Sequence, residues 1–303
     1  MAAIILNDVT KVYGKEKTVA VDHVSFAVEQ GELFGLIGPD GAGKTSIFRM
    51  LTTLLLPDNG SATVDGYDIV KDYVRIRSRV GYMPGKFSLY QDLTIEENLN
   101  FFATVFGTTI EQNYDLIKDI YVQIEKFKDR RAGKLSGGMK QKLALCCALI
   151  HKPSVLFLDE PTTGVDPVSR KEFWEMLKRL KAQNITIVVS TPYMDEAMMC
   201  DRIALMQTGR ILSIETPQRI MQSYPLPLYA VRADNMYGLL KAMPTFSKTI
   251  SSYAFGEYAH VSFREDVDVN EVTGFLRQHG FSDIDIKRTN PTIEDCFIQL
   301  LKA

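Results

Sequence analysis

The chain has 303 residues, 46% hydrophobic and 24% charged, and its 35 Lys and Arg against 37 Asp and Glu leave a formal net charge of −2. This balance excludes a protein that grips a nucleic-acid backbone through a large basic excess, and the apolar content excludes a disordered chain. Apolar runs are of strand length, the first eight residues lack a basic signal-peptide start, and the four cysteines show no CxxC spacing. We therefore expect a soluble protein of a reducing compartment, with about two domains.

The first quarter of the chain predicts strands on both sides of a glycine-rich loop. Alternating apolar and polar residues predict antiparallel strands over Ile4–Val12, Val19–Val28 and Ser61–Val64. Between them, Glu32–Ile37 predicts a short buried strand that runs into the loop. A helix is predicted to follow the loop, over Thr45–Leu55.

The middle of the chain predicts helices and then a parallel sheet. Residues Thr94–Leu149 have mostly helical periodicity. Two compact apolar strands follow, at Val155–Leu158 and Ile185–Ser190, with a helix around Trp174 between them. A strand–helix–strand order of this kind predicts parallel pairing, and hence an α/β fold.

A change in composition marks a domain boundary near residue 222. Two prolines lie close together in Ser223–Pro227, and the chain after them reads strand, helix, strand, strand, helix, strand, helix. We therefore predict an α/β domain over 1–222 and a small α+β accessory domain over 223–303. The isolated histidines His260 and His279 are interpreted as surface or strand residues, which leaves the second domain without predicted chemistry.

The glycine-rich loop matches the phosphate-binding pattern GxxxxGK[ST], with a strand before it and a helix after it. Glycines let successive backbone N–H groups point at phosphates. Lys44 is expected to place its ammonium on the β- and γ-phosphates of ATP, and the Thr45 hydroxyl to bind Mg²⁺. A plain glycine-rich turn is the alternative. The predicted nucleotide-binding residues here are Gly38, Pro39, Asp40, Gly41, Ala42, Gly43, Lys44, Thr45 and Ser46.

Two carboxylates end the strand that begins at Val155. Asp159 at the carboxyl end of this strand is expected to reach the shell of the Mg²⁺, and Glu160 to orient or polarise an attacking water. Glu160 and Lys44 are therefore the predicted catalytic residues. The alternative is a surface acidic pair that caps the element beginning at Pro161. The phosphate loop in the same chain disfavours this alternative.

Leu-Ser-Gly-Gly-Met-Lys-Gln at 135–141 lies between these motifs and heads an apolar helix. It resembles the LSGGQ signature of the ATP-binding subunits of ABC transporters, and all three motifs occur in that family's order. The resemblance implies a P-loop ATPase domain with a RecA-like core, an antiparallel β subdomain and a helical subdomain over about 86–150. It also implies that the signature contacts ATP held by a second ATPase subunit. Ser136 as an ordinary N-cap is the alternative; the residues concerned are Ser136, Gly137, Gly138 and Met139.

Further segments resemble the same family, specifically its type-2 exporter class and the first ATPase half of multidrug exporters. Tyr13 matches the family's aromatic residue that stacks on adenine; the alternative is a half-buried strand tyrosine. Thr163–Pro167 matches the loop that crosses to the partner subunit. The class resemblance rests on Gly81–Pro84, Leu93–Leu99 and Pro291–Phe297. It implies ATP hydrolysis on the inner face of the cell membrane, with separate permease subunits that dock near Phe87–Phe106. The exported substrate stays open.

Two positions depart from the family pattern. Gly85 stands where the family has a glutamine near Mg²⁺, and Pro192 where it has a histidine near the γ-phosphate, while Asp40 is an unusual acid within the phosphate loop. Losing one donor aimed at developing charge costs about 10²–10³ in rate. We therefore expect normal MgATP binding, slow turnover and an asymmetric pair of ATPase subunits. Thr191 and Pro192 are predicted to be the N-cap and first residue of a helix.

Three functions remain open from the sequence. The leading one is an energy-coupling subunit of an exporter, and the second is a regulatory partner that binds nucleotide without hydrolysing it. The third is an ABC protein that acts on ribosomes or DNA. The chain shows no second cassette, long coiled coil or basic insertion of the kind such proteins carry, and we therefore predict no nucleic-acid partner.

Overall fold

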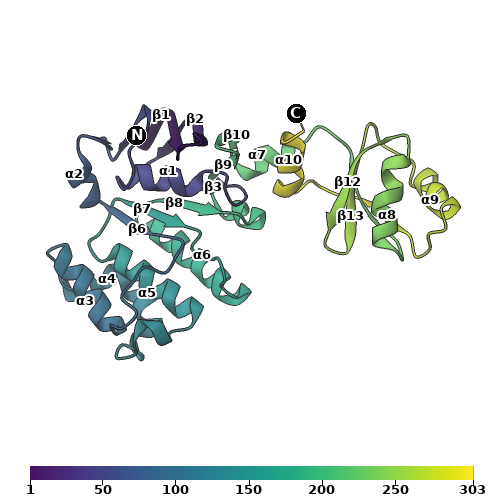
Figure 1. Cartoon of the computed structure of the whole chain (residues 1–303). Coiled ribbons are helices and arrows are strands. Elements are labelled where there is room, and N and C mark those ends of the chain that lie inside the picture. The colour runs from purple at the N-terminus through teal and green to yellow at the C-terminus, as the bar shows by residue number, and fades with distance from the viewer. Residues whose placement is uncertain (303) are drawn as a thin grey trace. The chain divides into compact units, whose positions relative to one another are not determined.

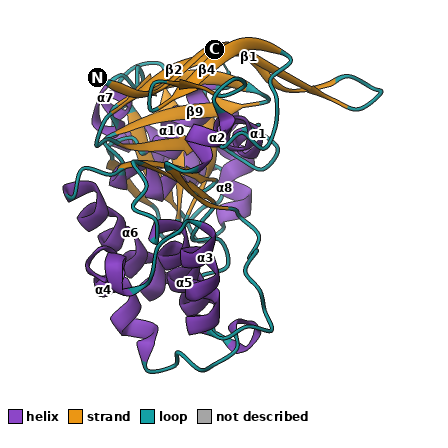
Figure 2. Ribbon diagram, turned by 90° about the vertical axis from the view of Figure 1, so that its left-hand side faces the viewer, coloured by secondary structure: helices purple, strands orange, loops and turns teal. Residues whose placement is uncertain are grey.

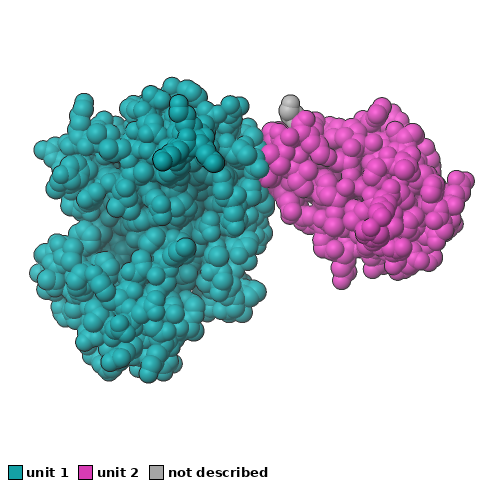
Figure 3. Space-filling view, viewed as in Figure 1, with its two compact units in different colours: residues 1–217 teal, residues 218–303 magenta. Residues whose placement is uncertain are grey.

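The computed structural model describes residues 1–302 and divides into two compact units, Met1–Pro217 and Gln218–Ala303 (Figure 3). This division precedes the predicted boundary at 222 by a few residues. The helix α7 (Pro217–Gln222) explains the difference, because the Ile220 carbonyl accepts a hydrogen bond from Cys296 Sγ of the second unit, so α7 belongs with that unit.

Two sheets build the first unit. The antiparallel sheet has the order β2-β1-β4-β5, and the larger sheet has the order β10-β9-β3-β8-β7-β6, in which only β10 runs antiparallel. The strands are β1 (Ala2–Tyr13), β2 (Thr18–Glu29), β3 (Leu33–Ile37), β4 (Asn59–Val64), β5 (Tyr67–Asp68), β6 (Val80–Met83), β7 (Val155–Asp159), β8 (Thr186–Thr191), β9 (Arg202–Gln207) and β10 (Arg210–Glu215).

The helices of this unit form two groups. α1 (Lys44–Leu51) lies between the sheets, whereas α3, α4 and α5 pack together below them (Figures 1 and 2). The other helices are α2 (Tyr73–Arg77), α3 (Ile95–Val105), α4 (Tyr114–Glu125), α5 (Gly137–Leu149) and α6 (Pro167–Ala182). Thr94 and Glu97 form a reciprocal capping box that fixes where α3 begins. The α/β architecture with a separate helical group confirms the predicted fold class.

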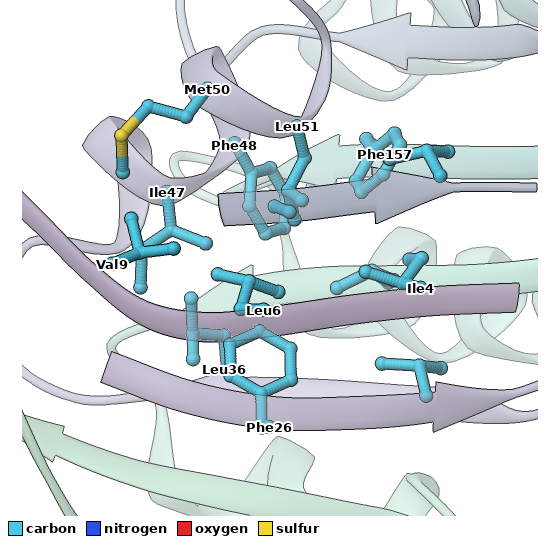
Figure 4. Close-up of a cluster of buried hydrophobic side chains, with 14 of the residues drawn as sticks. Ile4, Leu6, Val9, Phe26, Leu36, Ile47, Phe48, Met50, Leu51 and Phe157 are labelled. Carbon is cyan, nitrogen blue, oxygen red and sulfur yellow. The ribbon is translucent and has the colours of Figure 1, made fainter. Parts of the chain in front are cut away.

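One apolar core holds α1 against both sheets (Figure 4). Every residue of β3 and β7 is buried, as expected for central strands covered on both faces. The rings of Phe48 from α1 and Phe157 from β7 meet edge to face with centroids 5.6 Å apart. This packing fixes the start of α1 beside the carboxyl ends of β3 and β7.

The helix after the glycine-rich loop is shorter than predicted, since α1 ends at Leu51 and not at Leu55. Thr53 has a left-handed backbone (φ 62°), and the amides of Leu54 and Leu55 both donate to the Arg49 carbonyl. The apolar residues continue beyond the helix, so periodicity alone placed its end too late.

The second unit is an α+β domain with the predicted element order. Its antiparallel sheet has the order β12-β13-β11-β14. The elements are β11 (Leu228–Arg232), α8 (Met236–Ala242), β12 (Thr249–Phe255), β13 (Tyr258–Phe263), α9 (Val269–Gln278), β14 (Asp285–Arg288) and α10 (Ile293–Leu300). No helix within residues 1–302 is long and apolar enough to cross a membrane.

A fully buried carboxylate, Asp295, organises the start of α10. It accepts hydrogen bonds from His260 Nδ1 (2.8 Å), the Tyr253 hydroxyl (2.9 Å) and both the amide and the hydroxyl of Thr292 (2.7 Å each). Burial alone would raise the pKa of Asp295, but the hydrogen bonds from His260 and Thr292 outweigh it and hold this pKa below its usual value. His260 is thus a strand residue, as predicted, with a structural partner that its isolation in the sequence did not reveal.

Replacing Asp295 by Asn is expected to destabilise the second unit by about 3 kcal/mol at pH 7, because buried donors lose a charged acceptor. The folded pKa is lowered, so the carboxylate contributes stability above about pH 4 and loses it as the pH falls through the folded value. Native-state hydrogen exchange of the β11–β14 amides measures the free energy of opening of this unit. The difference in that free energy between variant and parent should be large at pH 7 and smaller at pH 3. An equal difference at both pH values would contradict this account.

Candidate nucleotide site

The phosphate loop (Gly38–Ser46) connects the carboxyl end of β3 to α1. Gly43 has φ 104°, and a Cβ there would lie 2.2 Å from the Ala20 carbonyl oxygen; a Cβ on Gly38 would lie 2.2 Å from that of Met206. Only glycine fits these two positions. No side chain within the described residues caps the helix at Gly43. The first amides of α1, which lack partners inside the helix, are therefore available to an anion.

Lys44 lies across this loop. Its buried ammonium donates to the carbonyls of Gly38 (2.8 Å) and Pro39 (2.9 Å) and lies 3.5 Å from Glu160 Oε1. The structure thus brings together the two residues that the sequence predicts to be catalytic. A lysine held by two weak carbonyl acceptors beside a carboxylate can turn toward a more strongly charged phosphate.

Asp159 and Thr45 meet at the ends of β7 and α1. Thr45 Oγ1 donates to Asp159 Oδ1 (3.2 Å), and Ser190 Oγ at the end of β8 donates to the same oxygen (2.5 Å). Burial and the Asp159 carboxylate raise the pKa of the neighbouring Tyr82 to about 12, so that phenol stays neutral. Asp159 is buried among hydroxyl groups that can hold it in one position.

The donor set at this point fits Mg²⁺. A hydroxyl and a carboxylate oxygen are hard ligands, and Mg²⁺ takes few protein ligands, keeping water and substrate phosphate oxygens instead. Across residues 1–302, no group of three or more His, Cys, Asp and Glu side chains could hold a metal unaided. Thr45 and Asp159 therefore suit an ion that arrives with a nucleotide and do not form a closed structural metal site.

Glu160 follows Asp159 with a left-handed backbone (φ 50°). Its amide donates to the carbonyl (3.0 Å) and the hydroxyl oxygen (3.1 Å) of Ser190, which holds this strained turn. The turn directs the Glu160 carboxylate toward Lys44. The Ser190 contacts were missed in the sequence, although two polar residues at the end of an apolar strand could have suggested them.

Tyr13 lies at the end of β1, beside the first turn of α1. Its hydroxyl is 3.2 Å from Ser46 Oγ, and 36% of the residue is exposed. The ring therefore borders the phosphate loop and offers accessible surface to a flat ligand. Asp40 is a surface residue of the loop.

The signature segment lies at the start of α5, in the helical group and away from α1 (Figure 1). Ser136 is the N-cap of α5, and its Oγ accepts from the Met139 amide (3.4 Å). A Cβ on Gly138 would lie 2.9 Å from Ser169 Oγ of α6, so glycine allows α5 and α6 to approach closely. The cap satisfies the Met139 amide, while Ser136 and Gly137 at the start of α5 stay exposed.

The two departures both border the Asp159–Glu160 pair. A Cβ on Gly85 would lie 3.1 Å from the Asp159 carbonyl oxygen, so this backbone passes directly beside the end of β7. Pro192 directly follows β8, the strand paired with β7 through Ser190 and Asp159. Neither residue offers a polar side chain to a ligand.

The predicted helix start at Thr191 is wrong. Thr191 is the last residue of β8, and the segment after it is the 3-10 helix η3 (Met194–Met199) with Tyr193 as its N-cap. Thr191 Oγ1 accepts from the Tyr193 amide (3.1 Å) but donates to the buried carboxylate of Glu196 (2.6 Å). The strand pairing of β8 with β3 overrides the local capping preference.

These features define a phosphate loop at the carboxyl edge of a parallel sheet, with two carboxylates on a neighbouring strand. The family model described as ABC transporter matches residues 21–163. The chain is 37% identical, over 99% of its length, to the probable multidrug ABC transporter ATP-binding protein YbhF of Escherichia coli, and spans 52% of that protein. It is 33% identical, over 98% of its length, to the Nod factor export ATP-binding protein I of a Rhizobium species, and spans 96% of it.

A solved structure agrees with these relatives. The ATP-binding cassette MJ0796, a dimer in a post-hydrolysis state bound to ADP and Pi, matches 70% of this chain and 98% of its own, with TM-score 0.64 and 25% identity. The chain belongs to the family of ABC transporter ATP-binding proteins. The family predicted from the three sequence motifs is therefore confirmed.

Proposed function

We propose that this chain is the ATP-binding subunit of an exporter, which couples MgATP binding and hydrolysis to export by separate membrane subunits. The single observation that carries the proposal is the meeting of Lys44 and Thr45 with Glu160 and Asp159 at one sheet edge. A nucleoside triphosphate with its cation requires a positive charge, backbone N–H donors and carboxylates, and these groups lie together at that edge.

Each residue has a proposed role in that site. The amides of Gly38–Ser46 and the Lys44 ammonium hold the phosphates, and the Tyr13 ring stacks on adenine. Thr45 and Asp159 hold Mg²⁺, which would neutralise charge on the β- and γ-phosphates. Glu160, 3.5 Å from Lys44, orients the attacking water. Ser136, Gly137, Gly138 and Met139 act on the nucleotide of a second ATPase subunit.

The site's own turnover is proposed to be slow. Gly85 and Pro192 border the carboxylate pair and present no side-chain donor there. Two groups that would stabilise the charge developing in the transition state are therefore missing. Binding needs neither of them. The signature segment is intact, so this chain could contact the nucleotide of a sister ATPase subunit whose own site is complete. The two subunits would then form an asymmetric pair.

A nucleotide-binding regulatory partner that never turns over is the second candidate, favoured by the same two positions. Glu160→Gln in the assembled complex separates the two functions. A lower ATPase rate of the complex would support hydrolysis at this site, and an unchanged rate would support the regulatory role. An action on ribosomes or DNA is disfavoured by the near-neutral charge.

A groove on the first unit suits a permease segment. It has a volume of about 430 Å³ and is lined mainly by apolar residues of β6, α3, α5 and the segment between β6 and α3, among them Met83, Leu89, Phe102, Val105 and Ala148. An apolar groove beside two helices fits an amphipathic helix. We assign this face to membrane subunits of the type-2 exporter class, which places the chain on the cytoplasmic face of the membrane. The Nod factor protein is named for export and YbhF for multidrug transport, and a multidrug substrate class is proposed by analogy with YbhF.

Val105→Asp is expected to reduce co-purification with the membrane subunits at least about tenfold, because a charge in the groove opposes an apolar helix. Val105 is 61% exposed, so folding should tolerate the change. Val122→Asp on α4 is a matched control, since Val122 is 52% exposed and does not line this groove. Equal recovery of partner with both variants would show that the groove is not the docking site.

Tyr13→Ala is expected to weaken MgATP binding about tenfold, because stacking of a base on an aromatic ring is worth about 1–3 kcal/mol. Tyr13→Phe keeps the ring and loses only the hydroxyl next to Ser46, and it should bind as the parent does. Equilibrium binding to a fluorescent ATP analogue measures both. If Phe weakens binding as much as Ala, the hydroxyl contact matters and stacking does not.

The second unit is proposed to serve ATPase dimer contacts or regulation. Its buried Asp295 accepts four hydrogen bonds within the unit, one of them from His260, which favours a structural role for these residues.

A further inference from the structure

A second buried carboxylate, Glu196 of η3, lies close to the nucleotide site and is not part of the roles above. It is 3% exposed and accepts four hydrogen bonds. Thr191 Oγ1 donates to Oε2 (2.6 Å), whereas Thr162 Oγ1 (2.7 Å) and two guanidinium nitrogens of Arg170 (2.9 and 3.1 Å) donate to Oε1. A buried charge with this many partners holds them in one arrangement, because breaking any of them leaves a charge under-solvated.

The three donors come from three different segments of the site. Thr191 ends β8, Thr162 follows Glu160 by two residues, and Arg170 lies in the first turns of α6, the helix that Asp166 caps. The Thr191 carbonyl in turn accepts from the amide of Gly38, the first residue of the phosphate loop (3.2 Å). One carboxylate therefore connects the phosphate loop, the segment after Glu160 and the start of α6.

Pro192 lies inside this network. Its neighbour Tyr193 donates its amide to Thr191 Oγ1 (3.1 Å), and the Arg170 guanidinium lies over the Tyr193 ring at 4.4 Å. Arg170 also lies 3.4 Å from Asp195. The loop 191–193 is thus held on one side by Glu196 and on the other by Arg170, without any side chain of residue 192.

We infer that Glu196 is a positioning residue for the γ-phosphate end of the nucleotide site. It fixes loop 191–193 and, through Thr162, the turn that carries Glu160. Lys44 contacts the β- and γ-phosphates in the proposed function, on which this inference rests, and Glu160 lies 3.5 Å from Lys44. The groups held by Glu196 thus adjoin the phosphate loop and the turn of Glu160, which the proposed function assigns to the terminal phosphate that ATP has and ADP lacks. Glu196 therefore acts on ATP selectivity through Thr191 and Thr162 without touching the nucleotide.

Thr191→Val tests this, because it keeps a similar shape and removes the hydroxyl that donates to Glu196 and accepts from the Tyr193 amide. The dissociation constants of the purified chain for a non-hydrolysable ATP analogue and for ADP are measured with Mg²⁺. We expect the variant to bind the analogue about fivefold more weakly and ADP within twofold of the parent. Thr191→Ser, which keeps the hydroxyl, should restore the parent's ratio, and Glu196→Gln should reproduce the selective loss.

Two results would overturn the inference. Parent-like binding of both nucleotides by Thr191→Val and by Glu196→Gln would mean that Glu196 has no effect on the site. Equal weakening for both nucleotides would mean that the network only supports the fold. Neither result depends on turnover. If the unmodified chain itself bound neither nucleotide, the proposed function would fail, and this outcome is distinct from both.

Discussion

Lys44→Ala should weaken MgATP binding about 100-fold. The ammonium is already positioned over the loop by the carbonyls of Gly38 and Pro39, so it reaches the phosphates without a large rearrangement. A hydrogen bond to a charged group contributes up to about 3 kcal/mol, and each 1.4 kcal/mol corresponds to a factor of about ten. The loop amides remain in the variant, so binding should weaken but persist at high nucleotide concentration.

Equilibrium binding measures this effect, with Lys71→Ala as the control. Lys71 is an exposed lysine between β5 and α2, and its substitution removes the same charge from the chain. A similar loss of affinity in both variants would point to long-range charge and not to a direct phosphate contact. Parent-like binding by Lys44→Ala would contradict the assignment of the phosphate loop.

Pro192→His should raise the ATPase rate of this chain's site by about 10². The loop 191–193 is held independently of residue 192, by Glu196 and Arg170, and Pro192 itself is only partly buried. A histidine there can therefore be added without unfolding the loop, and it would supply a donor aimed at developing phosphate charge. Gly85→Gln is a poorer choice, because its Cβ would lie 3.1 Å from the Asp159 carbonyl oxygen.

Pro192→Ala is the matched control for that gain, since it removes the ring without adding a donor. Steady-state phosphate release, with MgATP above its dissociation constant, compares the two variants. A rise with His alone would show that the missing donor limits turnover. An equal rise with Ala would assign the limit to the rigidity of the proline. No rise with either variant would mean that residue 192 does not limit the reaction.

The sequence made the phosphate loop, β3 and β7 predictable because their signals are local. Gly38 and Gly43 are required by close backbone contacts, and β3 and β7 are short buried strands that are apolar except for Asp159 at the end of β7. The sequence predicted roles for Lys44, Thr45, Asp159 and Glu160, but not that Lys44 contacts Glu160 and Thr45 contacts Asp159. These contacts arise because the carboxyl ends of parallel strands share one edge of a sheet.

The contacts of β8 could not be predicted in the same way. This strand is inserted between β3 and β7, which precede it in the chain, and that order alone brings Ser190 to Asp159 and Thr191 to Gly38. Glu196 finds Thr162 and Arg170 across 34 and 26 residues of sequence. Local capping rules predicted a helix start at Thr191 because they do not include such long-range pairing.

The most direct test of a complete binding site with slow turnover is the steady-state ATPase rate of the purified chain. It is measured beside MgATP binding, with Glu160→Gln as the control for both. The account predicts tight MgATP binding and a rate no faster than that of Glu160→Gln, since the donors missing at Gly85 and Pro192 limit turnover in the absence of a sister subunit. Robust turnover that Glu160→Gln abolishes would contradict it and would mean that the chain hydrolyses ATP by itself.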